Sequence, residues 1–199
     1  MTGIQALERI APTQSMQPGQ VERREFEYER HGTLSLIANF AVVTGQVISP
    51  SLGPTRTEAD FAAHIAGTID TDPEGVWLFI VDQLNTHQSE TLVRLVAERC
   101  GINDDLGEKG TSGVLRSMAT RAAFLSDPTH RIQLVYVPKH TSWLNQIEIW
   151  FSILVRRVLK RGNFASVDAL RARILEFIAY FNQTAKPFKW TYTGRPLVI

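Results

Sequence analysis

VWLFIV, residues 76–81, is an unbroken run of apolar residues that ends directly at Asp82. Apolar runs of this length are typical of strands that are covered on both faces of a sheet. The preceding residues, Asp72–Gly75, include the proline and glycine of a turn. We therefore expect a central strand over residues 76–81. Asp82 then stands at the carboxyl end of that strand, where open α/β sheets bind their ligands.

The segments around this strand predict an alternation of strands and helices. The apolar run 34–43, the turn at residues 44–45 and the segment 46–49 predict a β-hairpin beside the central strand. A second apolar run predicts a strand over residues 132–137, and apolar residues at helical spacing predict helices over residues 57–69, 88–100, 143–161 and 166–182. Thr57 with Asp60 forms a capping-box pattern, and Ser166 is the expected cap of the last helix. This order predicts an α/β fold with one mixed sheet flanked by helices.

Length and composition suit a single domain over residues 1–199. The chain is 44% apolar and 21% charged, which gives enough material for a core and argues against global disorder. We expect an irregular segment over residues 1–29, with a short helix or strand near residues 4–10, and a loop over residues 186–199. Residues 101–127 contain four glycines and clustered charges, so we expect an insertion that loops out, with a short helix at 114–124.

Several function classes are excluded by features that the sequence lacks. The net charge of +1 rules out a uniformly basic coat, and the single cysteine, Cys100, suits a reducing cytoplasm. No apolar run approaches the roughly 20 residues of a membrane helix, and the first residues do not form a signal peptide. We therefore expect a cytoplasmic protein without a membrane partner. Phosphate-loop, nucleophile-elbow and zinc-protease motifs are absent, and the five histidines show no metal-ligand spacing.

Two carboxylates are candidates for a divalent-metal site. Asp82 follows the most apolar strand, and Glu148 is the only charged residue in the first half of the helix expected from Trp143. A lone carboxylate among apolar residues is unfavourable unless it is paired, binds a cation or reaches water. Each residue also has a structural interpretation, because Asp82 could cap a turn and Glu148 could lie at the edge of the apolar stripe. If they bind Mg²⁺ or Mn²⁺ together, we expect their carboxylates within about 4–8 Å of each other.

A group of basic residues follows Glu148 along the chain. The pairs Arg156–Arg157 and Lys160–Arg161 recur at a four-residue offset, so they share one side of the expected helix. A surface of this kind suits a phosphate backbone, and Lys139 lies just before the same helix. The alternative is a solvated helix end whose cations complement the helix dipole. The nucleic-acid-binding candidates are Lys139, Arg156, Arg157, Lys160 and Arg161.

Three motifs together resemble one family. The segment HTSWLNQIEIWF, residues 140–151, is similar to the third acidic motif of DDE transposases of the mariner-related bacterial insertion-sequence group. The segment VDQLNTH, residues 81–87, resembles the second acidic motif, with a histidine five residues after the aspartate. The segment TGIQALE, residues 2–8, resembles the stretch after the first acidic motif. Residues 161–166 and 181–182 resemble the carboxyl-terminal part, so the similarity covers essentially the whole chain.

The resemblance implies a fold, a chemistry and a substrate. It implies a ribonuclease H-like fold and DNA strand cleavage and joining, as in transposition and integration, at a two-metal site with Mg²⁺ or Mn²⁺. Asp82 and Glu148 would be catalytic metal ligands, and the partners would be DNA, as transposon ends and target. A homodimer is compatible with this interpretation.

The sequence also departs from the family pattern. The first acidic residue of the family would precede Thr2, so we expect most of the first strand to be missing and this chain to be inactive. Gln83 stands where asparagine is usual, and Asp82 lies unusually far from Glu148 in sequence, which a looped-out 101–127 segment would explain. Two alternatives stay open. One is a non-catalytic nucleic-acid-binding or oligomerising transposase remnant, and the other is an unrelated α/β protein whose carboxylates are structural.

Overall fold

The structure, a computed structural model, describes residues 1–139 and 141–191. His140, the first residue of the expected third acidic motif, and residues 192–199 of the expected terminal loop lie outside the described residues. The strands are β1 (Ile4–Arg9), β2 (Tyr28–Ala41), β3 (Gln46–Gly53), β4 (Trp77–Val81) and β5 (Ile132–Tyr136). The α-helices are α1 (Glu58–Ile69), α2 (Glu90–Arg99), α3 (Met118–Leu125), α4 (Ile147–Leu154) and α5 (Val167–Gln183).

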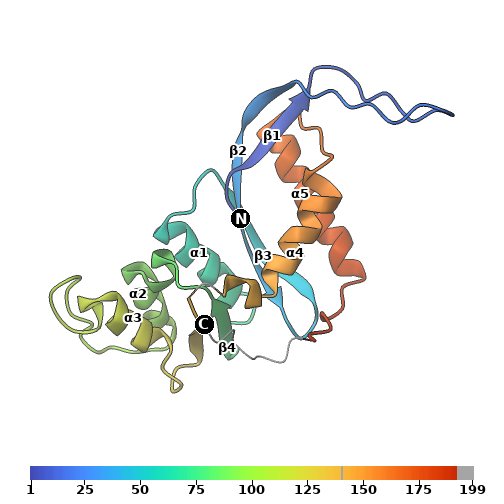
Figure 1. Cartoon of the computed structure of the whole chain (residues 1–199). Helices are drawn as coiled ribbons and strands as arrows, with labels where there is room; N and C mark the ends of the chain where they lie inside the picture. The colour runs from blue at the N-terminus through green and yellow to red at the C-terminus, as the bar shows by residue number, and fades with distance from the viewer. Residues whose placement is uncertain (140, 192–199) are drawn as a thin grey trace, which may run out of the picture.

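The expected hairpin is present and forms part of a three-stranded antiparallel sheet. β2 pairs with β1 on one side and with β3 on the other. Successive residues of a strand face opposite sides, so Leu34 and Leu36 enter a core with α4 and α5, while Asn39 reaches the other face. There the Asn39 amide donates to Thr68 Oγ1 of α1 at 2.7 Å. The sheet is therefore covered by α1 on one face and by α4 and α5 on the other (Figure 1).

β4 and β5 form a separate parallel pair, which corrects the expectation of one mixed sheet. Among the described residues, β4 pairs only with β5, and no strand joins β4 to the hairpin. The expectation that β4 is covered on both faces is also wrong. Phe79 and Val81 are buried against α1 and α2, whereas Leu78 is 60% and Ile80 45% exposed. The unbroken apolar run therefore does not reflect burial on both sides of this strand.

The expected helix boundaries hold where the sequence contains a side-chain cap. Thr57 and Asp60 form the predicted capping box at the start of α1, and Ser166 accepts from the Ala169 amide at the start of α5. The helix expected over residues 143–161 begins later, because a 3₁₀ turn (Ser142–Leu144) precedes it. Its second half is a π-helical turn (Val155–Leu159), in which the Lys160 amide donates to the Val155 carbonyl at 2.8 Å.

Residues 101–127 are more ordered than expected, and the amino-terminal segment contains the short strand expected near residues 4–10. Within residues 101–127, a 3₁₀ turn (Val114–Arg116) and α3 pack into the core around β4 and β5, and Leu115 and Leu125 are fully buried. The expectation of a looped-out segment is therefore wrong for this part. At the amino-terminal end, β1 and the first residues of β2 form a ladder, and residues 10–27 between them project from the body as a long hairpin (Figure 1).

The expected fold class is confirmed. The chain is a mixed α/β structure with antiparallel and parallel strands, compatible with a ribonuclease H-like fold. Within the described residues, none of the helices combines the length and the apolar character needed to cross a bilayer.

Candidate functional site

Asp82 lies immediately after β4 in a tight turn that fixes its side chain. The Leu84 amide donates to Asp82 Oδ1 at 3.3 Å, and His87 Nδ1 lies 2.8 Å from the same oxygen. His87 Nδ1 is also 3.1 Å from the Asp82 carbonyl. Because both neighbours of Nδ1 are acceptors, this nitrogen has to carry the proton. One carboxylate oxygen is therefore held by the turn, and within residues 1–139 and 141–191 Oδ2 makes no hydrogen bond.

His87 is held rigidly from two sides. Its ring lies against Phe61 of α1, with the ring centroids 4.1 Å apart, and its carbonyl accepts from the Tyr136 hydroxyl at 2.8 Å. The hydrogen bond from His87 lowers the pKa of the Asp82 carboxyl below its usual range, and the positive charge of Arg56 acts in the same direction. Asp82 is therefore ionised near neutral pH, as a metal ligand needs to be.

Glu148 lies in the first turn of α4, where an acid is favoured by the helix dipole. Its backbone amide donates to the Asn145 carbonyl at 3.0 Å, and its side chain is exposed. Within residues 1–139 and 141–191, the Glu148 carboxylate makes no hydrogen bond or ion pair. The sequence left open whether this carboxylate is buried or reaches water, and the structure places it in water.

One hydrogen bond joins the start of α4 to the end of β4, which directly precedes Asp82. The Asn145 side-chain amide donates to the Ile80 carbonyl near the end of β4 at 3.1 Å. The Met1 amino group feels both acids, because the negative charges of Glu148 and Asp82 raise its pKa, against a larger lowering by burial. The Asn145–Ile80 hydrogen bond thus joins the elements that carry Asp82 and Glu148, which lie far apart in sequence.

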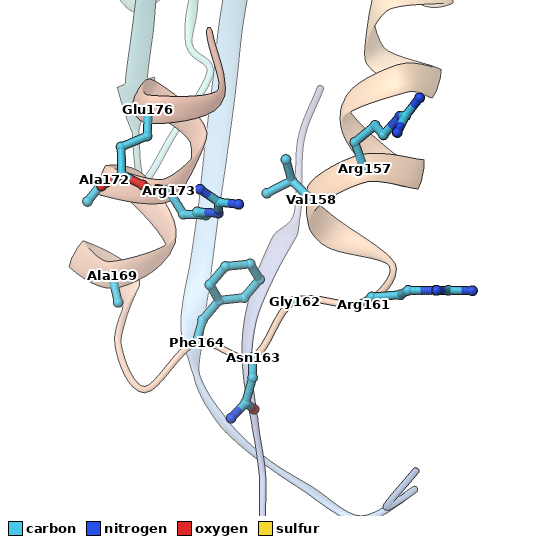
Figure 2. Close-up of a pocket in the computed structure, with 10 residues that line it drawn as sticks. All are labelled: Arg157, Val158, Arg161, Gly162, Asn163, Phe164, Ala169, Ala172, Arg173 and Glu176. Carbon is cyan, nitrogen blue, oxygen red and sulfur yellow. Dashed lines mark hydrogen bonds and ion pairs between the residues drawn. The ribbon is translucent and has the colours of Figure 1, made fainter. Parts of the chain in front are cut away.

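The basic residues after Glu148 do not form one uniform row. Arg157 and Arg161 line a pocket of about 450 Å³ together with Arg173 of α5, whereas Arg156 and Lys160 are exposed outside that lining. Figure 2 shows Arg157 and Arg161 extending to the same side, while Arg173 points across from α5 towards Phe164. The π-helical turn contains Arg156 and Arg157 and ends just before Lys160, and it changes the expected four-residue alignment. Lys139 is exposed just before the third acidic motif.

Three residues near these groups were not singled out by the sequence patterns. Arg56 precedes α1, and its charge lowers the pKa of both Asp82 and the Met1 amino group. Asn145 bridges α4 to β4, and Arg173 joins the pocket from a different helix. Asn145 lies inside the segment 140–151 that resembles the third acidic motif, so the sequence could have indicated it. Arg56 and Arg173 come close only through the fold.

The residues present fit a divalent cation in part. Asp82 offers one oxygen without a hydrogen bond in the described structure, and Glu148 offers both of its oxygens. Among the described residues, the group of three or more potential metal ligands that lie close together contains neither of them. Carboxylate oxygens are the ligands that Mg²⁺ prefers, and it often takes only one or two from the protein.

Comparison with protein-family models shows the family to which this chain belongs. The family model described as DDE superfamily endonuclease matches residues 2–171. The chain belongs to this family. Searches of curated proteins and of solved structures find no match. Enzymes of the DDE superfamily generally use divalent metals and act on DNA, so the family agrees with the chemistry of the two acids.

Proposed function

We propose that this DDE endonuclease domain is a transposase catalytic domain of the mariner-related bacterial insertion-sequence group. Its chemistry would be divalent-metal-dependent cleavage and joining of DNA strands. The observation that carries the proposal is the hydrogen bond from the Asn145 side chain, three residues before Glu148, to the carbonyl of Ile80, two residues before Asp82, because it joins the two elements that carry these acids. Their carboxylates would lie within about 4–8 Å, the span of a two-metal site.

Each nearby residue has a distinct part in this proposal. Asp82 and Glu148 would hold Mg²⁺ or Mn²⁺ through carboxylate oxygens. Ions bound there would supply activation of the attacking oxygen and stabilisation of the leaving oxygen of the phosphodiester. His87 keeps the Asp82 carboxylate ionised and in one orientation, and Asn145 keeps the start of α4 beside the end of β4.

The exposed cations would bind the DNA backbone rather than the bases. Arg156, Arg157, Lys160 and Arg161 are all exposed, and so is Lys139, which precedes Glu148 in the chain. Guanidinium and ammonium groups bind phosphates without reading sequence. This part of the proposal concerns DNA of any sequence, and choice of transposon ends is outside it.

We also propose that the chain Met1–Ile199 by itself cleaves DNA weakly or not at all. A two-metal mechanism needs a ligand that is shared between the ions. Among the described residues, Asp82 and Glu148 belong to no group of three or more potential metal ligands, and Glu8 belongs to another group. A cytoplasmic location and a homodimer are further parts of the proposal, supported by the single cysteine and by the family resemblance.

The test combines metal binding with strand cleavage. Loss of the free Mn²⁺ resonance signal measures binding by the chain, by Asp82→Asn and by Glu148→Gln. We expect weak binding that either substitution reduces at least about tenfold. Cleavage of a matching transposon end is compared between this chain and one preceded by Asp-Glu, and we expect activity only in the longer chain.

The outcomes separate the two candidate functions. Robust cleavage by the short chain, abolished by Asp82→Ala, would show that the first carboxylate is supplied elsewhere. No cleavage by either chain, with DNA binding retained, would favour the non-catalytic nucleic-acid-binding or oligomerising remnant. That second function is favoured by the exposed cations together with an incomplete set of metal ligands.

A further inference from the structure

A cluster of three potential metal ligands lies at the base of the projecting hairpin. Glu8 of β1 and Glu29 and His31 of β2 have ligand atoms that all lie within 4.8 Å of one another. His31 Nε2 is 2.8 Å from Glu8 Oε2. The Glu8 and His31 side chains are 39% and 23% exposed, so an ion has access from solvent. The cluster shares no residue with the Asp82 and Glu148 pair.

A β-bulge creates this cluster. β1 and β2 pair regularly up to Ala6 opposite Gly32, but the next pair is Leu7 opposite Arg30. His31 is therefore the extra residue, without a partner in the ladder. Gly32 has a φ of 135°, and a Cβ at this position would meet Val167 of α5 at 2.9 Å. Glycine at 32 thus permits the bulge, and bulges redirect side chains at such points.

The bulge also replaces favourable charge pairs with an unfavourable one. In unshifted register, Glu8 would lie opposite Arg30, and Arg9 opposite Glu29. In the observed register, Glu8 lies directly opposite Glu29. Like charges directly opposite in a sheet are destabilising, and Glu29 forms no ion pair among the described residues. A cation held between the two carboxylates and His31 would remove this repulsion.

We propose that Glu8, Glu29 and His31 bind a zinc ion that fixes the base of the hairpin formed by residues 10–27. Zn²⁺ takes imidazole nitrogen and carboxylate oxygen at about 2.0–2.2 Å, so its ligand atoms lie roughly 3–4 Å apart. Small rotations of the two glutamate side chains bring the observed cluster to that spacing. The imidazole favours Zn²⁺ over Mg²⁺, which prefers oxygen ligands. On binding, the proton on His31 Nε2 moves to Nδ1 or to solvent.

The test is calorimetric titration of the folded chain with Zn²⁺, together with visible spectra of the Co²⁺ form. We expect one saturable site, and at least about tenfold weaker binding in His31→Gln and Glu29→Gln. Glu27→Gln is the matched control, because it removes the same charge from an exposed position two residues away. It should bind as the native chain does, and so should the double variant Asp82→Asn with Glu148→Gln.

Three results would overturn the proposal. The first is the absence of a saturable Zn²⁺ site in the native chain. The second is equal affinity in Glu29→Gln and Glu27→Gln, which would mean non-specific binding to surface acids, and the third concerns the other pair of acids. Glu29 is exposed, so its substitution tests the site even if His31→Gln does not fold. Loss of Zn²⁺ binding only in the Asp82 and Glu148 double variant would place the ion at the other pair of acids.

Discussion

Removal of two arginines should change how DNA binding by this domain depends on salt. The change is Arg157→Ala with Arg161→Ala, two exposed residues that line one pocket beside the π-helical turn. Each cation that neutralises a phosphate releases counterions when DNA binds. Arg173 in the same pocket is engaged by Glu176 at 3.3 Å, so it substitutes poorly for the lost cations.

The expected size of the effect follows from the number of exposed cations. If Arg156, Arg157, Lys160 and Arg161 each contact one phosphate, log K falls with log salt at a slope of about −3.6, since each contact contributes about 0.9. The double variant should have a slope of about −1.8. Between 50 and 200 mM salt, affinity should therefore fall about 150-fold for the native chain and about 12-fold for the variant.

Fluorescence anisotropy with a labelled duplex of arbitrary sequence measures both slopes. The matched control is Arg116→Ala with Lys189→Ala, which removes the same charge from exposed positions beside α3 and after α5 that form no ion pair among the described residues. An unchanged slope in the first variant would show that these arginines are only a solvated helix end. Equal decreases in both variants would show that overall charge, and not this surface, determines binding.

Three further predictions concern stability and ionisation. His64 is buried, its Nε2 has no partner in the described structure, and burial lowers its pKa to about 4 from 6.5. Because the unfolded chain binds a proton at this histidine more readily than the folded chain does, the free energy of unfolding should fall by about 2 kcal/mol between pH 7 and pH 5. Urea unfolding at several pH values measures this change, and a free energy that does not vary with pH would contradict it. Leu115→Ala should lower the free energy of unfolding by about 2–5 kcal/mol if residues 101–127 are packed as observed, and by less than about 0.5 kcal/mol if they loop out. His87→Ala should raise the pKa of Asp82 in a carboxyl NMR titration, because the hydrogen bond from the His87 ring makes the largest contribution to lowering that pKa. An unchanged pKa would show that this hydrogen bond is absent in solution.

The local elements of the fold were well predicted where the sequence contains turn residues or helix-capping residues. The turn at residues 44–45 and the caps at Thr57 and Ser166 predicted the hairpin and two helices with close boundaries. Errors arose where packing decides. Leu78 and Ile80 were predicted to be buried because they lie in an apolar run, but they are exposed. Residues 101–127 were predicted to loop out because they are rich in glycine, but they contribute Leu115 to the core.

The candidate sites divide in the same way. Asp82 and Glu148 were predicted from sequence because each stands alone beside apolar residues, and their role as metal ligands stays a prediction. The Glu8, Glu29 and His31 cluster was missed, and the statement that the histidines have no ligand spacing was incomplete. His31 meets Glu8 across two strands, 23 positions away in sequence. No spacing rule along one element predicts a contact that a β-bulge creates.

The sequence by itself determined the element types, the family and the two lone acids. These depend on local preferences and on motifs of a few adjacent residues. The tertiary structure decided which strands pair, the exposure of Glu148, and the cluster of Glu8, Glu29 and His31. It also decided that Arg157, Arg161 and Arg173 line one pocket. Those features depend on which segments meet in space, and a register shift of one residue changes every facing pair beyond it.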